Sequence, residues 1–210
     1  MSSTLHDRKK YVKISLGAHM KKLIIDFDDV ICNNEFVTCY NEFFHTNKKH
    51  SDFGGFYVDS AIKDLDTRRA FGEYVVKRNF YKNATIKEGA VEAVEKLSKK
   101  YSVYICTAYY MDYVRNLCGT ILEQKYTFIA EHIPTFDMSK IIFTNSKSVV
   151  NGDIMIDDNV NNLITNNACT KLLFTAEHNE SIEKEELIKH NIIRVNGWQE
   201  ILKLLEADVD

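Results

Sequence analysis

Three carboxylates within four residues are the part of this sequence that is best suited to chemistry. Asp26, Asp28 and Asp29 come directly after the apolar residues 23–25. Clustered acids are costly to bury unless a cation or a proton offsets their charge, so an apolar run that ends in them indicates a buried strand leading into a site. We expect a hard divalent metal ion to balance this negative charge. Two carboxylates two positions apart can act as a nucleophile and a general acid/base, with magnesium held between them and a phosphate.

Three further apolar runs lead into residues that a phosphoryl-transfer site needs. One leads to Thr107, whose hydroxyl and neighbouring backbone amides can hydrogen-bond a phosphate oxygen. The next is followed by a loop with Lys147, a mobile ammonium that can offset charge on a nucleophile and a phosphate. A third ends at Asp157 and Asp158, which can complete an oxygen-rich magnesium site. Ligands bind at the carboxyl ends of strands in open α/β sheets, so these residues converge if their strands are neighbours.

Each of these residues also has a plainer interpretation when it is taken alone. Chance supplies on the order of one Asp-x-Asp match in a chain of this length. Thr107 could be a turn or helix-cap hydroxyl, Lys147 a solvated surface charge, and Asp157 with Asp158 the cap of the next helix. These alternatives become weaker when the residues are taken together, because all of them follow apolar runs in the order that a phosphoryl-transfer site needs. Lys140 competes with Lys147 for the cationic role, but it precedes its strand, whereas Lys147 follows it on the side where the acids are expected.

The elements that position these residues follow from alternating apolar runs and helical patterns. Short apolar runs recur at residues 23–27, 103–106, 141–143, 154–156, 172–174 and 192–195. Helical spacing is clear over residues 87–100, and a closing helix carries its apolar stripe on Trp198, Ile201, Leu202 and Leu205. Such alternation predicts an α/β fold, with a doubly wound, mainly parallel sheet covered on both faces.

The connection between the first strand and the helix at residue 87 is longer than a simple crossover requires. Residues 34–45 and 67–80 have helical patterns rich in Phe and Tyr, and residues 51–55 form a predicted flexible turn. A small helical cap over the end of the first strand would fit. Gly54 and Gly55 could make that cap mobile, or could serve only for turning.

These patterns predict a core domain interrupted by one insertion. We assign residues 20–32 and 84–210 to the core and residues 33–83 to the helical cap. Residues 1–19 are basic, lack periodicity and precede a second methionine, so we expect a leader or a disordered arm there.

Composition excludes several classes of function. The formal charge of −3 and the pI near 6.2 argue against coating of a nucleic-acid polymer, although one small phosphorylated ligand needs only local positive charge. The five cysteines form no CxxC pair, which predicts buried reduced thiols instead of a disulfide framework or a zinc site. No stretch approaches the ~20 apolar residues that cross a bilayer. We therefore expect a cytoplasmic protein that does not bind a membrane, and we leave its oligomeric state open.

The order and placement of the four motifs resemble the haloacid-dehalogenase superfamily of phosphohydrolases. Residues 26–30, Thr107, Lys147 and the pair Asp157 and Asp158 match its motifs, and the resemblance covers about residues 20–167. The helical insertion resembles a type 1 cap of that Rossmann-like fold. The segment 145–158 is similar to the 5'(3')-deoxyribonucleotidase family, in which a lysine precedes a short spacer and a hydrophobic-Asp-Asp end.

The resemblance implies a magnesium-dependent phosphatase that acts on a small phosphomonoester, foremost a (deoxy)nucleoside monophosphate. Asp26 would form an aspartyl-phosphate, and Asp28 would protonate the leaving alkoxide and then activate water. Lys147 would hold Asp26 and the phosphate together, while Thr107 and the amide of Ala108 would bind phosphate oxygens. Magnesium would be held by Asp26, the carbonyl of Asp28 and Asp157, with Asp158 acting through water.

Two departures from the family pattern bear on the recognition of a base. Thr107, Ala108 and Tyr109 stand where the family commonly has Thr-Ser-Pro, and the expected aromatic base platform falls at Asn34. Other aromatics could stack on a base or could belong to the core, namely Phe36, Phe43, Phe44, Tyr57, Tyr109 and Tyr110. The alternatives to a nucleotidase are a phosphatase for another small metabolite such as a sugar phosphate, and a non-catalytic or receiver-like phosphate-binding protein.

Overall fold

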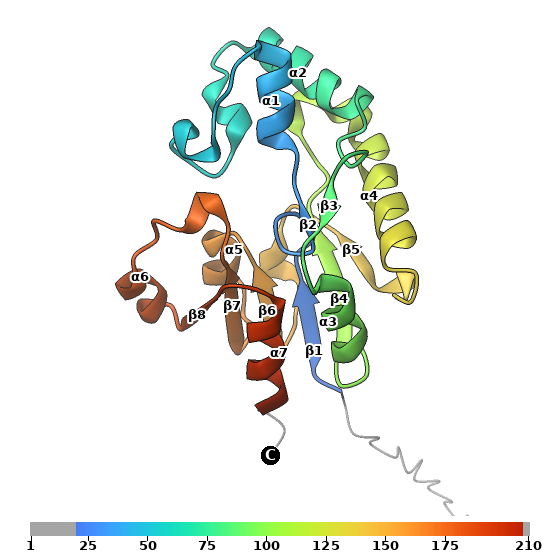
Figure 1. Cartoon of the computed structure of the whole chain (residues 1–210), viewed down its shortest axis with the longest axis vertical. Coiled ribbons are helices and arrows are strands. Elements are labelled where there is room, and N and C mark those ends of the chain that lie inside the picture. Colours follow the sequence, from blue (N-terminus) through green and yellow to red (C-terminus); the bar gives the residue numbers. More distant parts are fainter. Residues whose placement is uncertain (1–19, 208–210) are drawn as a thin grey trace, which may run out of the picture.

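A computed structural model describes residues 20–207, which are built around a six-stranded, fully parallel sheet (Figure 1). Its strand order is β5-β4-β1-β6-β7-β8. The strands are β1 (Lys22–Ile25), β4 (Ser102–Thr107), β5 (Ile141–Phe143), β6 (Ile154–Asp157), β7 (Thr170–Phe174) and β8 (Ile192–Val195). Each of the six apolar runs in the sequence corresponds to one of these strands, as predicted, although the first run, residues 23–27, extends two residues beyond β1.

Helices cover both faces of the sheet, which confirms the doubly wound arrangement. Leu23 and Ile25 pack into one apolar core, and Ile24 between them packs into the other. The first core includes residues of α3 (Ala90–Leu97), α4 (Cys118–His132) and α7 (Trp198–Ala207), and the second includes residues of α5 (Val160–Thr165) and α6 (Lys184–Lys189). Strands buried on both faces read as continuous apolar runs, which is why they stood out in the sequence.

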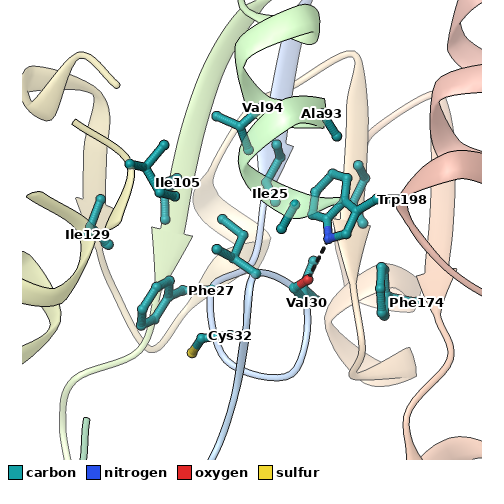
Figure 2. Packing of buried hydrophobic residues seen from close by; sticks show 14 of the residues in the cluster. Ile25, Phe27, Val30, Cys32, Ala93, Val94, Ile105, Ile129, Phe174 and Trp198 are labelled. Carbon is teal, nitrogen blue, oxygen red and sulfur yellow. Dashed lines mark hydrogen bonds between the residues drawn. The ribbon is translucent and has the colours of Figure 1, made fainter. Parts of the chain in front are cut away.

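The turn after β1 is fixed by packing and by hydrogen bonds to its backbone. Trp198 is buried against Val30, and its indole N–H donates to the Val30 carbonyl at 2.9 Å (Figure 2). The amide of Ile31 donates to the Phe27 carbonyl at 2.9 Å, and Asp29 adopts a left-handed backbone with φ of 56°. The closing helix therefore helps to hold the turn that carries the first acidic cluster.

The long connection forms its own layer of helices between β2 (Cys32–Asn33) and β3 (Thr85–Ile86), which pair antiparallel. It contains α1 (Phe36–Phe44), the 3₁₀ helices η1 (His50–Phe53) and η2 (Val58–Ala61), and α2 (Leu65–Lys77). Figure 1 shows α1 and α2 beyond the carboxyl ends of the strands. The rings of Phe43 and Phe71 pack 5.6 Å apart between these helices, so aromatic contacts hold the layer together.

The predicted helices are present, with boundaries that differ by a few residues. Asp64 caps α2 by accepting a hydrogen bond from the Thr67 amide at 2.7 Å, so this helix begins two residues before the predicted start. Gly89 precedes α3 with φ of 76°, which makes that helix shorter than the predicted 87–100. Gly54 ends η1 with φ of 65°, as expected for a turn residue. The predicted leader at residues 1–19 lies outside the described residues.

Two expectations from composition can be compared with residues 20–207. All five cysteines are free, and four of them are buried, but Cys169 is exposed, so a buried thiol was the wrong prediction at that position. Within this part of the chain, no helix has the length and apolar character that crossing a membrane requires.

Four further 3₁₀ helices complete the described part of the structure, namely η3 (Asp112–Leu117), η4 (Met138–Lys140), η5 (Lys147–Val149) and η6 (Glu177–Asn179).

Candidate active site

The predicted site residues come together at the carboxyl edge of the sheet because their strands are neighbours. β1 lies between β4 and β6, and β5 flanks β4. Asp26 follows β1, Thr107 ends β4, and Asp157 ends β6. The loop after β5 carries Lys147 to the same edge, where its ammonium lies 2.7 Å from an oxygen of Asp26 and 2.7 Å from one of Asp157. The convergence expected from the sequence is thus present in the structure.

Lys147 is a buried cation held between two carboxylates. Its side chain is 4% exposed. Burial alone would lower the pKa of Lys147, but Asp157 and Asp26 raise it by a larger amount, so the ammonium stays charged. The loop that carries it is anchored by the buried Asn166, whose amide donates to the carbonyls of Lys147 at 2.7 Å and Val150 at 2.9 Å. Lys140, the competing lysine, instead lies over the ring of Tyr104.

The carboxylate of Asp26 is held in one orientation in a crowded acidic environment. Its Oδ1 accepts hydrogen bonds from Lys147 at 2.7 Å and from the Phe27 amide at 2.6 Å. Burial raises the pKa of Asp26 to about 6, and Asp157 and Asp28 act in the same direction, whereas Lys147 opposes them. The group is therefore a carboxylate whose negative charge needs further compensation.

The acidic cluster fits a hard divalent cation. Asp26, Asp157 and Asp158 each offer one carboxylate oxygen, and these atoms lie within 4.8 Å of one another. Oδ1 of Asp158 is buried and accepts no hydrogen bond from any group within residues 20–207. Burial, together with the charges of Asp26 and Asp157, raises the pKa of Asp158 well above its usual range. An oxygen-only donor set with one unpaired buried oxygen is the environment that Mg²⁺ or Ca²⁺ would complete.

Asp28 is held by two residues that the sequence did not single out. The Tyr81 hydroxyl donates to Oδ1 of Asp28 at 2.6 Å, and the Lys125 ammonium donates to Oδ2 at 2.5 Å. Burial, followed by the charge of Asp28, raises the pKa of Tyr81 well above its usual range, so the phenol remains a donor. One signal for Lys125 was available, because it lies on the buried stripe of α4 with Ile121, Phe128 and Ile129. Nothing comparable marked Tyr81.

The loop after β4 lines the site, and the Thr107 hydroxyl at its start donates a hydrogen bond to Oδ2 of Asp28 at 3.4 Å. Thr107 is fully buried, and its hydroxyl accepts a hydrogen bond from Lys125 at 2.6 Å. Ala108 and Tyr110 line the cavity described below. Asn145 from the loop after β5 fixes this backbone, since its Oδ1 accepts from the Tyr110 amide at 3.0 Å and its Nδ2 donates to the Tyr110 carbonyl at 2.9 Å.

A cavity of about 540 Å³ lies between the helical layer and the carboxyl edge of the sheet. Its walls include Asp26, Asp28, Lys147 and Asp158 from the acidic end, together with many aromatic residues. The aromatic lining residues are Phe36, Phe56, Tyr57, Phe80, Tyr81, Tyr109, Tyr110 and Tyr113. Phe43 and Phe44 instead pack against the core, which is the plainer of their two predicted roles. Asn34 also lines the cavity, and its side chain is bonded to Asp29.

His178 joins the helical layer to the acidic cluster, and sequence reasoning missed it. Its Nε2 lies 2.9 Å from Oδ2 of Asp158, and burial lowers the pKa of His178 to about 4. The His178 ring contacts those of His50 and Phe56, at centroid distances of 5.2 and 4.6 Å. Asp29, Asp158 and His178 also bring ligand atoms within 4.8 Å of one another. A histidine in a short 3₁₀ helix such as η6 carries no sequence signal of such a position.

Comparisons with known proteins agree with this geometry. Residues 20–209 match the family model described as "5' nucleotidase, deoxy (Pyrimidine), cytosolic type C protein". The chain is 28% identical over 185 residues to a 5'(3')-deoxyribonucleotidase of Clostridium acetobutylicum, which covers 87% of this chain and 93% of that protein. It is 27% identical over 189 residues to a 5'(3')-deoxyribonucleotidase of Bacillus subtilis, covering 89% and 99% of the two chains.

The fold is also similar to that of a solved structure with little sequence identity. A haloacid dehalogenase-like hydrolase from Streptococcus pneumoniae superposes with a TM-score of 0.57 at 15% identity, covering 89% of this chain and 98% of that one. The predicted haloacid-dehalogenase-like α/β fold is thereby confirmed.

Proposed function

The chain belongs to the family of cytosolic type C 5' nucleotidases, deoxy (pyrimidine), which makes it a phosphomonoester hydrolase, and we propose that its substrates are (deoxy)nucleoside monophosphates. We further propose that it uses Mg²⁺ and an aspartyl-phosphate intermediate. The observation that carries this proposal is the contact of Lys147 with Asp26 and Asp157 at the base of a cavity large enough for a nucleotide. The names of the bacterial relatives, both 5'(3')-deoxyribonucleotidases, support the same substrate class.

In this mechanism Asp26 is the nucleophile. A carboxylate oxygen of Asp26 bonds to phosphorus as the bond between phosphorus and the leaving oxygen breaks, which divides a difficult hydrolysis into two steps. Lys147 and the Phe27 amide fix the Asp26 carboxylate before reaction, so little reorientation is needed when substrate arrives. The Lys147 charge also lowers the repulsion between that carboxylate and the incoming phosphate.

Asp28 transfers the protons. It donates a proton to the leaving alkoxide in the first step, and in the second step it takes one from the water that releases phosphate from Asp26. The Thr107 hydroxyl and the backbone amide of Ala108, in the loop fixed by Asn145, would bind phosphate oxygens.

We propose that the acidic cluster holds the metal. The carboxylates of Asp26, Asp157 and Asp158 and the backbone carbonyl of Asp28 would be its ligands, in agreement with the unpaired oxygen of Asp158. Bound there, Mg²⁺ would neutralise charge on the phosphate and orient it for in-line attack.

We propose that residues 33–83 act as a cap over a core made of residues 20–32 and 84–210. The cap would supply part of the nucleoside site, because its residues Phe36, Tyr57 and Phe80 line the cavity. Aromatic rings on such a wall can stack on a base without hydrogen-bonding it. We also propose that the enzyme works in the cytoplasm, which the family's description as cytosolic and the free cysteines support.

A substrate panel tests the proposed function directly. Phosphate release is measured from deoxyribo- and ribonucleoside 5'- and 3'-monophosphates and from sugar phosphates, with Mg²⁺ and with an excess of a chelator. We expect turnover of nucleoside monophosphates with Mg²⁺, its loss in chelator, and its loss in Asp26→Asn. Asp66→Asn serves as the matched control, because the Asp66 side chain is 92% exposed. Absence of nucleotide turnover, or turnover by Asp26→Asn at the wild-type rate, would refute the proposal.

A further inference from the structure

Lys125 is a charged side chain inside an otherwise apolar helix face. It is 4% exposed and lies on the stripe of α4 that also buries Phe128 and Ile129. Removing an ammonium from water is costly, and well-packed apolar residues often replace buried ion pairs without loss of stability. Folding alone therefore does not account for a lysine at this position.

The contacts of Lys125 converge on the carboxylate to which the mechanism assigns proton transfer. Its ammonium lies 2.5 Å from Oδ2 of Asp28 and 2.6 Å from the Thr107 hydroxyl. It also lies 5.7 Å from the centroids of the Phe27 and Tyr81 rings. Hydrogen bonds and ring contacts on several sides give the ammonium one defined position.

The two buried lysines serve different carboxylates. Lys147 contacts Asp26 and Asp157, whereas Lys125 contacts Asp28. Asp28 has a second partner in Tyr81, whose hydroxyl donates to Oδ1 while Lys125 donates to Oδ2. Both oxygens of Asp28 are thereby fixed, from α4 on one side and from the segment before β3 on the other. The nucleophile and the proton-transfer group each have a cation of their own.

We propose that Lys125, together with Tyr81, is a positioning residue that aims Asp28 at the leaving-group oxygen. The inference rests on the proposed function, because it takes Asp28 as the proton donor to the leaving alkoxide. General acid catalysis requires the donor to lie within hydrogen-bonding reach of the oxygen that it protonates. A protonated carboxyl group whose two oxygens each accept a hydrogen bond keeps one orientation, so it can give its proton to the leaving oxygen without a search among rotamers.

This role predicts a dependence on the leaving group that a purely structural role does not. A nucleoside leaves as a basic alkoxide, which needs the proton from Asp28 as the P–O bond breaks. Para-nitrophenolate is a stable anion and leaves without a proton. Loss of the positioning residues should therefore slow the nucleotide much more than para-nitrophenyl phosphate.

The experiment compares kcat and KM for both substrates in wild-type protein, Lys125→Met and Tyr81→Phe. For Lys125→Met we expect kcat for a nucleoside monophosphate to fall about 10²-fold or more, the range of general acid catalysis, with a small change in KM. We expect para-nitrophenyl phosphate to lose less than about 10-fold, since that leaving group needs no general acid. Tyr81→Phe keeps the ring and should show the same pattern more weakly. Lys96→Met is the control, because that side chain is 50% exposed on α3.

The outcomes separate this inference from the proposed function. Equal losses for the two substrates, or no loss for the nucleotide, would overturn the positioning role while the nucleotidase proposal stands. Failure of the wild-type protein to hydrolyse any nucleotide would overturn the proposed function and this inference with it. Tyr81→Phe decides the matter if Lys125→Met does not fold, as judged by circular dichroism, because the phenylalanine retains the buried ring.

Discussion

Gly72 in α2 is a position where one added methyl group should disturb the contact between the helical layer and the rest of the protein. A Cβ at Gly72 would lie 2.5 Å from Cε2 of Tyr113 and 2.9 Å from Cγ1 of Val114, both in η3. Atoms cannot approach so closely, so either the Tyr113 ring or α2 must move. Val114 is 1% exposed and has little room to adjust. Gly72→Ala therefore forces α2 and η3 apart.

Two opposing effects set the size of the change. Alanine in place of a helical glycine gains about 0.5–1 kcal/mol from the lower entropy of the unfolded chain. Forcing extra atoms into a packed contact costs about 1–3 kcal/mol. The difference between these ranges is about 0–2.5 kcal/mol, so we expect Gly72→Ala to lower the free energy of unfolding by about 1 kcal/mol, near the middle of that range.

Gly119 in α4 provides the matched control. A Cβ at Gly119 would have nothing within 4 Å, so only the favourable effect remains. We expect Gly119→Ala to raise the free energy of unfolding by about 0.4–1 kcal/mol. The same substitution in two helices should thus change stability in opposite directions.

Urea unfolding monitored by circular dichroism measures the free energy of unfolding of both variants. In a thermal scan, a change of about 1 kcal/mol would shift the melting temperature by about 2–4 °C at this chain length. Tyr113 lines the cavity, so Gly72→Ala should also raise KM for a nucleotide, whereas Gly119→Ala should leave it unchanged. If Gly72→Ala stabilised the protein as much as Gly119→Ala, the packing argument would be wrong.

Two further predictions concern the loops that carry site residues. Asn166→Ala removes the hydrogen-bond donor to the buried carbonyls of Lys147 and Val150, so we expect the free energy of unfolding in urea to fall by about 1–3 kcal/mol. Because the same loop positions the Lys147 ammonium, we also expect kcat to fall. Asn145→Ala frees the backbone at Tyr110, and steady-state kinetics should show KM for the nucleotide raised several-fold with kcat little changed. An unchanged KM in that variant would mean that the loop keeps its conformation without Asn145.

The sheet and its acidic edge were predictable from the sequence because one physical rule governs both. Parallel strands covered on both faces must be apolar along their whole length, so they appear as continuous runs. Polar residues directly after such runs can only lie at the carboxyl edge. Asp26, Thr107, Lys147 and Asp157 could therefore be placed near one another before any coordinates were known.

Helix boundaries were harder because local capping decides them. The apolar stripe on Ala90, Val94 and Leu97 identified α3, but the left-handed Gly89 starts that helix later than the predicted residue 87. Asp64 likewise starts α2 earlier than the aromatic pattern did. Cys169 shows the same limit for burial, because a cysteine just before a strand can face solvent even though most free cysteines are buried.

The side chains that hold Asp28 and Asp158 could not be found by the rule for strand ends. Lys125 and Tyr81 reach Asp28 from α4 and from the segment before β3, and His178 reaches Asp158 from η6. Their positions depend on how helices and connections pack over the sheet, which the spacing of residues in one element does not encode. A lysine within an apolar helical stripe is the exception, because burying its charge requires a partner. Lys125 in α4 is such a lysine, and its partner is Asp28, which lies outside the helix.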